Sequence, residues 1–203
     1  METKTSRSQT SSREKILASA SLLFIRNGYQ ATSVDDILAG CGVAKSNFYY
    51  HFKSKEDLAC AVLDRRFEEY EQMMRSSLSA YSLTPAQRLD KFFYCLMEGQ
   101  TGLDNTTGCP FGNFAAALSM SEEEQNERFR IRLCQLFRRI EGYMHACLLE
   151  GAARGEFRND IAPLDLANHL VATLQGLLML TKTFQNPTML REGMAIAQQI
   201  IKK

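Results

Sequence analysis

The segment Ser33–Phe52 constrains the fold most, because its sequence, SVDDILAGCGVAKSNFYYHF, reads as two short helices joined by a glycine turn. Ser33 and Asp36 have the spacing of a capping box, in which each residue satisfies a backbone amide at the start of a helix. Glycine at positions 40 and 42 predicts a tight turn, and a second helix is expected over Ala44–His51. The residues placed to pack the two helices against each other are Ile37, Leu38, Val43, Phe48 and Phe52.

The second of these helices carries hydrogen-bonding side chains on the face opposite its apolar residues. In a helix-turn-helix, such a helix lies in the DNA major groove, where base edges present a readable pattern of donors and acceptors. Lys45 has the reach to contact guanine O6 or N7, and Asn47 has the amide that pairs with adenine. Tyr49, His51 and Lys55 are expected to hold phosphates, which set affinity and register. The full set of candidate DNA contacts is Ser33, Lys45, Ser46, Asn47, Tyr49, Tyr50, His51 and Lys55.

Helix spacing alone leaves an alternative open, because an ordinary helical hairpin with a solvated polar face has the same pattern. In the DNA-binding interpretation, the backbone amides of the helix that starts at Ser33 would hold a further phosphate.

The net charge of the chain is only +1, from 24 basic and 23 acidic residues, so any surface that binds nucleic acid must be local.

Apolar residues recur at helical spacing along the rest of the chain, which predicts nine helices and no convincing strand. The low proline count, 4 among 203 residues, also favours an all-α fold. We expect residues 1–10 to form a flexible tail, residues 11–53 a helix-turn-helix DNA-binding domain of three helices, and residues 54–203 a six-helix body.

Composition excludes several classes of protein. Hydrophobic residues make up 45% and charged residues 23%, which excludes wholesale disorder and collagen-like repeats. No run of 18 apolar residues occurs, so no transmembrane helix and no membrane partner are expected. The N-terminus lacks the apolar core of a secretory signal, and the six cysteines form no C-x-x-C pair, so reduced thiols in a cytoplasm are expected. The three histidines do not cluster with cysteines at zinc-ligand spacing, so neither a metal nor a cofactor is expected.

The stretch Gly28–Leu58, GYQATSVDDILAGCGVAKSNFYYHFKSKEDL, closely resembles the DNA-binding domain of the TetR family of bacterial transcriptional repressors. The shared pattern runs from Gly-Tyr and Thr-Ser, through Ala-Gly-x-Gly-Val, to Tyr-Tyr-His-Phe and Lys-x-Lys-Glu-Asp-Leu. The resemblance covers roughly residues 12–60, and only helical character and length match beyond it.

The resemblance implies a homodimer of all-helical subunits that binds a palindromic operator in double-stranded DNA. The six-helix body would dimerise and bind a small apolar or electrophilic effector, which releases the DNA. The last two long helices, over residues 163–184 and 187–202, would pair with those of the partner as a four-helix bundle. The family's habit alone favours a repressor over an activator.

Methionine and aromatic side chains in the body are suited to line an adaptable effector pocket. For any one of them, an ordinary place in the core is the simpler interpretation. No constellation of buried charge indicates a charged effector. The candidate pocket residues are Phe93, Met97, Cys109, Phe111, Phe114, Phe137, Met144, Leu178 and Met179.

Cys109 stands at the start of a short predicted helix, where a thiol can have a lowered pKa and a raised reactivity. Its Gly-Cys-x-x-Gly-Asn element resembles one found in a TetR subgroup that includes sensors of electrophiles and oxidants, although Pro110 replaces the more usual aliphatic residue. A buried cysteine that fixes the turn is the alternative. Lys182 is a candidate neighbour of the thiolate, and the other body cysteines, Cys95, Cys134 and Cys147, are expected to be inert core residues.

Two other classes of function remain as alternatives. A cysteine-dependent enzyme would use Cys109 with His145 or His169, but no catalytic motif links these residues. A helical adaptor that binds other proteins would leave the polar face Lys45–His51 without a purpose.

Overall fold

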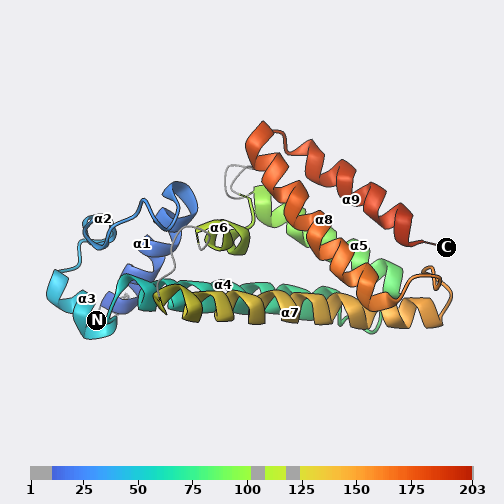
Figure 1. Ribbon diagram of the computed structural model, residues 1–203, viewed down its shortest axis with the longest axis horizontal. Helices are drawn as coiled ribbons and strands as arrows, with labels where there is room; N and C mark the ends of the chain where they lie inside the picture. The colour runs from blue at the N-terminus through green and yellow to red at the C-terminus, as the bar shows by residue number, and fades with distance from the viewer. Residues whose placement is uncertain (1–10, 102–107, 118–123, 203) are drawn as a thin grey trace, which may run out of the picture. The chain divides into compact units, whose positions relative to one another are not determined.

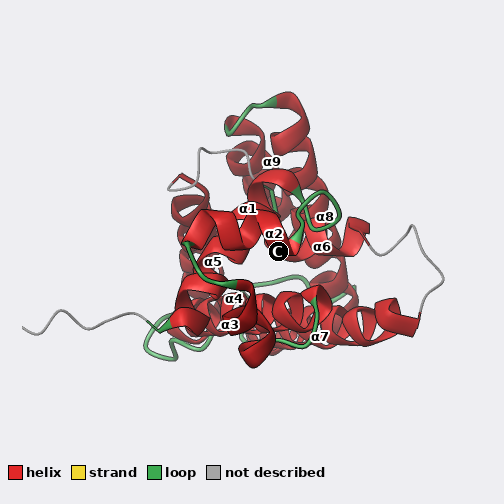
Figure 2. Ribbon diagram, turned by 90° about the vertical axis from the view of Figure 1, so that its left-hand side faces the viewer, coloured by secondary structure: helices red, strands yellow, loops and turns green. Residues whose placement is uncertain are grey.

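The computed structural model describes residues 11–101, 108–117 and 124–202, and these form helices joined by short loops (Figures 1 and 2). The described residues contain nine α-helices and no strand, so the predicted all-α fold is confirmed. An isolated bridge joins Phe157 to Lys202. The expected tail, residues 1–10, lies outside the described residues. The helices are α1 (Ser12–Asn27), α2 (Val34–Cys41), α3 (Lys45–His51), α4 (Lys55–Ser77), α5 (Pro85–Thr101), α6 (Pro110–Ala117), α7 (Glu124–Ala153), α8 (Pro163–Phe184) and α9 (Thr188–Ile201).

The chain divides into two compact units, Met1–Asp64 and Arg65–Lys203. Helix α4 begins in the first unit and ends in the second. The first unit contains α1, α2 and α3, and the second contains α5 to α9.

Local sequence signals set the helix ends of the first unit. The predicted capping box at the start of α2 is present in both directions between Ser33 and Asp36. Gly28 ends α1 with φ of 84°, and Gly42 follows α2 with φ of 65°, which is a left-handed conformation that glycine adopts without strain. A side chain at Gly40 would lie 2.7 Å from Ser19 Oγ, so glycine here allows α1 and α2 to approach closely.

The predicted packing residues of the first unit form its core with the inner face of α1. Ile37, Leu38, Phe48 and Phe52 are buried, as expected, whereas Val43 is half-buried. Helix α1 packs against α2 and α3, and its buried residues are Ile16, Leu17, Ala20, Phe24 and Ile25.

In the second unit, α8 packs against both α7 and α9. Close approaches in this unit depend on glycine. A Cβ at Gly193 of α9 would lie 2.3 Å from Leu177 of α8, and a Cβ at Gly151 would lie 2.1 Å from the ring of the buried Phe157. Alanine at either position would force the neighbouring side chain to move.

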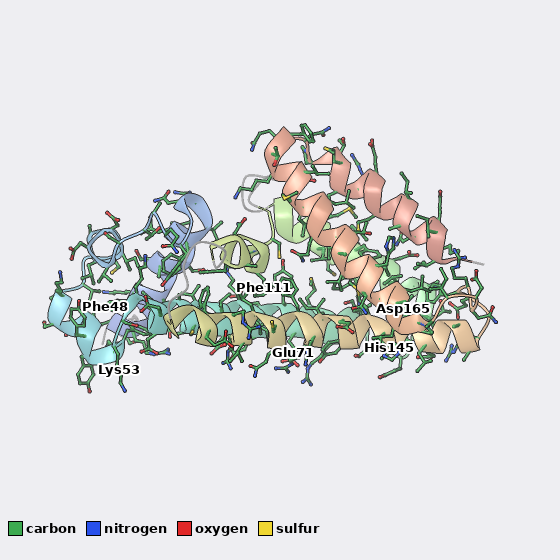
Figure 3. All side chains as sticks on the ribbon, viewed as in Figure 1. Phe48, Lys53, Glu71, Phe111, His145 and Asp165 are labelled. Atoms are coloured by element: carbon green, nitrogen blue, oxygen red, sulfur yellow. The ribbon has the colours of Figure 1, made fainter. Side chains whose placement is uncertain are left out.

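Helix α6 inserts a fully buried phenylalanine, Phe111, where it meets α4 and α7 (Figure 3). The ring centroid of Phe111 lies 5.0 Å from that of Tyr70, 6.3 Å from Phe67 and 6.5 Å from Phe137, each in an edge-to-face arrangement. On α4, the Glu71 carboxylate accepts hydrogen bonds from Arg139 and Tyr143 of α7. Aromatic packing and this polar contact therefore both join α4 to α7 within the second unit.

Arg88 is a buried charge that sequence reasoning did not identify, with 1% of its surface exposed. Its guanidinium pairs with Glu150 of α7, donates to the Leu78 carbonyl at 3.3 Å and lies 5.1 Å from the Tyr81 ring centroid. The contacts of Arg88 therefore join α5 to α7 and to the end of α4.

Among the helices of the described ranges, none is both long and apolar enough to span a membrane.

Candidate functional site

Helix α3 exposes the polar face that the sequence predicts. Its seven residues include one buried side chain, Phe48, which is fully enclosed in the core of the first unit. Because this side chain fixes the rotation of the helix, its other residues point outward. Tyr49 is 56% exposed and Tyr50 is 84% exposed. The remaining exposed members of the candidate set on α3 are Lys45, Ser46 and Asn47, with His51 half-buried.

Lys45 is held by an acidic residue that the sequence interpretation did not include. Its Nζ lies 2.9 Å from Oδ1 of Asp35 on α2, and both side chains are largely exposed. The hydrogen bond and the charge of Asp35 raise the pKa of Lys45 above its usual value. This contact uses one of the three N–H donors of the Lys45 ammonium.

Ser33 caps the start of α2. Its backbone N–H and its hydroxyl both donate to Oδ2 of Asp36, at 2.8 and 2.6 Å, and its Oγ accepts from the Asp36 amide at 3.1 Å. The hydrogen bonds from Ser33 lower the pKa of Asp36. The phosphate contact expected at this helix start stays a prediction.

Lys55 is likewise engaged within the first unit. Its Nζ donates to the carbonyls of Tyr29 and Thr32, both at 3.1 Å, and lies 4.3 Å from the Tyr29 ring centroid. Partial burial lowers the pKa of Lys55. The Tyr29 hydroxyl donates to Glu56 at 3.2 Å. Lys55 and Glu56 therefore fasten the loop between α1 and α2 to the start of α4.

A groove of about 560 Å³ lies between α6 and α8 in the second unit. Two of the expected pocket residues, Cys109 and Met179, line it. The complete lining among the described residues is Gly108, Cys109, Gly112, Asn113, Gln175, Gly176, Met179, Lys182 and Thr183.

The other seven expected pocket residues do not line this groove. They lie in the second unit, buried or half-buried. Phe93, Phe111, Phe114, Met144 and Leu178 are buried, and Met97 and Phe137 are half-buried.

Glycines shape the groove. Gly108 has φ of 73°, and a Cβ there would lie 3.3 Å from Cδ of Lys182. A Cβ at Gly112 would lie 3.0 Å from Oε1 of Gln175. The missing side chains thus leave room for the α8 residues to reach across, and Lys182 Nζ donates to Asn113 Oδ1 at 3.3 Å.

Sequence reasoning missed Gln175, Asn113 and Thr183 as lining residues. The helical period does place the lining residues of α8, at positions 175, 176, 179, 182 and 183, on one face of that helix. It does not identify the helix on the other side of the groove.

Of the two interpretations of Cys109, the structure supports the buried cysteine and not the thiol with a lowered pKa. Burial raises the pKa of the Cys109 thiol, and hydrogen bonds from Gly112, Gln175 and Phe111 do not offset it. Lys182 bonds to Asn113 instead of the thiol. The expectation of a core position is wrong for Cys134, which is exposed on α7, although Cys147 is buried as expected.

Two family models match the chain. Residues 16–62 match bacterial regulatory proteins of the tetR family, and residues 85–197 match the tetracyclin repressor-like C-terminal domain. The second match alone spans more than half of the chain.

Similar proteins agree with both models. The HTH-type transcriptional repressor DhaR of Mycobacterium sp. strain GP1 is 32% identical over 178 residues, which cover 88% of this chain and 86% of that protein. The HTH-type transcriptional repressor ComR of Escherichia coli is 27% identical, over 81% and 77%. The crystal structure of regulatory protein TetR from Rhodobacter sphaeroides superposes with a TM-score of 0.85 at 22% identity, over 93% and 97% of the two chains. The chain therefore belongs to the TetR family of bacterial regulatory proteins and is a transcriptional regulator, not an enzyme.

Proposed function

We propose that this regulator is a repressor whose homodimer binds a palindromic operator through α3 and leaves it when an effector occupies the body. The observation that carries the proposal is the exposed hydrogen-bonding face of α3, fixed in place by the buried Phe48. Two similar proteins, DhaR and ComR, are named repressors. The domains we assign to these tasks are residues 11–53 for DNA and residues 54–203 for the effector and the dimer.

Exposed apolar side chains on α8 and α9 support the dimer. Phe184 of α8 is 63% exposed, and Ile196 of α9 is 58% exposed. Leu180 and Ile200 add to this surface. Apolar patches of this kind mark interaction sites, and a second copy of α8 and α9 would cover them in a four-helix bundle. A two-fold dimer presents two α3 helices, which matches a palindrome.

Release requires that the effector bind the two conformations of the regulator unequally, because a ligand with equal affinity for both shifts nothing. The groove between α6 and α8 is the proposed effector site. Helix α6 also carries Phe111, which packs against α4. A ligand that moves α6 would therefore disturb α4, the helix that begins in the DNA-binding unit.

Selection of bound sequences from random DNA, followed by fluorescence anisotropy, tests the DNA-binding role. We expect a palindromic site. On it, Lys45→Ala should cost roughly ten- to a hundredfold in affinity and relax the sequence preference, as loss of a base contact does. Asp35→Asn should raise affinity for unrelated DNA and so lower specificity, because it removes a negative charge beside the phosphates.

Lys53→Ala provides the matched control, since Lys53 is an exposed lysine of the same unit that lies outside α3. Equal losses on all sequences from Lys45→Ala would show that Lys45 does not read a base. Selection that returns no preferred sequence would contradict the DNA-binding role itself.

Lys55→Met tests whether Lys55 positions the helix-turn-helix or contacts a phosphate. We expect affinity to fall by a similar factor for all sequences, because the loop between α1 and α2 loses its attachment to Lys55. The slope of log affinity against log salt concentration should stay unchanged. Loss of a phosphate contact would instead reduce that slope by about one. Anisotropy titrations over a range of salt concentrations distinguish the two roles, with Lys53→Met as the control.

Timed alkylation with iodoacetamide tests the reactivity of Cys109. The thiolate is the reacting form, and burial raises the pKa of Cys109. We therefore expect the exposed Cys134 to be modified well before Cys109 at neutral pH, as measured by mass spectrometry of the peptides. Equal rates would favour a reactive Cys109 and the electrophile-sensing subgroup. In that case Cys109→Ser should leave DNA binding intact and abolish release by electrophiles.

A further inference from the structure

The described residues that line the groove between α6 and α8 carry charge of one sign only, which is positive. Lys182 is the charged residue among its described lining residues, and none of these is an aspartate or glutamate. One of the three N–H donors of its ammonium bonds to Asn113 Oδ1.

Gln175 of α8 is a second polar side chain that lines the groove, and its amide group carries two N–H donors and one carbonyl acceptor. Glycine at position 112 leaves the space in which the Gln175 side chain lies. Lys182 and Gln175 are two turns apart on the same face of α8, so both can address one ligand.

The rest of the groove suits an apolar body. Its walls include the glycine backbones of positions 108, 112 and 176 and the thioether of Met179, which is 62% exposed. A volume of about 560 Å³ is within the range of small-molecule sites. A cationic ligand would meet Lys182 with no carboxylate among the described lining residues to balance it.

We propose that this groove binds a small apolar carboxylate, with Lys182 as the charge partner of its acidic head, Gln175 as a second donor and Met179 against its apolar body. The inference rests on the proposed function, because it assigns the chemistry of the effector site.

Calorimetric titration of the full-length protein with three probes of equal length, octanoate, octanamide and octylammonium, tests the charge preference. We expect octanoate to bind most tightly. Lys182→Met should weaken octanoate about ten- to a hundredfold, the range for loss of a charge-assisted hydrogen bond, and leave octanamide nearly unchanged. Lys182→Arg should restore most of the octanoate affinity, because it keeps the charge. Lys91→Met, which removes an exposed lysine from α5 with the same change in net charge, should have no effect.

Gly112→Ala gives a second test, because its Cβ would displace Gln175 without changing charge. It should weaken octanoate and octanamide together. The proposal is overturned if octanoate does not bind, if octanamide or octylammonium binds as tightly, or if Lys182→Met leaves octanoate binding unchanged. DNA anisotropy on the same samples reports separately on the proposed function. If octanoate binds through Lys182 without releasing DNA, the groove is a carboxylate site but octanoate binding there does not regulate DNA binding. This result would contradict the effector role and support the carboxylate site.

Discussion

Phe48→Ala should abolish DNA binding by unfolding the first unit, although Phe48 contacts no DNA in the proposed complex. Phe48 is 0% exposed and is the one buried side chain of α3. Its ring lies 5.1 Å from Tyr49 and 5.9 Å from Phe52, measured between centroids. Truncating a buried phenylalanine typically costs about 3–5 kcal/mol of unfolding free energy. That loss is most of the stability expected of a unit this small.

Tyr50→Ala is the matched control, because this aromatic residue lies two positions away and is 84% exposed. It should leave the unfolding free energy within about 0.5 kcal/mol of wild type. Circular dichroism during thermal unfolding suits the comparison, since the chain has no tryptophan. A Phe48→Ala protein with unchanged helix content and melting, but without DNA affinity, would contradict the anchoring role.

Phe111→Ala should destabilise the second unit by a similar amount, about 3–5 kcal/mol. Phe111 is fully buried, and its ring contacts Phe67 and Tyr70 of α4 and Phe137 of α7. Its removal deletes the three edge-to-face contacts and leaves a cavity among Phe67, Tyr70 and Phe137. We also expect Cys109 to react faster with iodoacetamide, because the adjoining turn of α6 loses its anchor.

Denaturant unfolding followed by circular dichroism measures this loss, at equal protein concentrations because a dimer's stability depends on concentration. Phe111→Leu should cost less, since it keeps more of the buried volume. Tyr94→Ala removes an aromatic residue of α5 that is 59% exposed, and it should have little effect. Equal stability of Phe111→Ala and Tyr94→Ala would show that α6 does not depend on the aromatic contact.

The sequence predicts helix ends well wherever the signal is local. The capping residues Ser33 and Asp36 form the expected box, and Thr84 and Gln87 form another at the start of α5, with hydrogen bonds of 3.0 and 3.3 Å. Such signals act across three residues, so no knowledge of the fold is needed to recognise them. The buried face of α3 was equally predictable, because helical period alone places Phe48 opposite the polar residues.

The partners of individual polar side chains within the chain were not predictable in the same way. The sequence did not indicate that Lys55 bonds to a loop carbonyl 23 residues earlier in the chain, or that Lys45 pairs with Asp35 of another helix. Arg88 is buried because Glu150, 62 residues later, balances its charge. A long charged side chain can pair with any group that the tertiary structure places within its reach. Its neighbours in the sequence therefore do not identify its partner.

The sequence by itself determined the all-helical fold, the helix-turn-helix and the family. Helical periodicity, helix caps and glycine turns depend on residues that are close together in the sequence, so they can be recognised without the fold. Only the tertiary structure decided that the groove lies between α6 and α8, that Lys182 and Gln175 cross it, and that Cys109 is buried with a raised pKa. These features arise where segments some 60 residues apart in the chain meet. Burial at such a contact shifts the pKa of a charged group or a thiol more strongly than the neighbouring residues in the sequence do.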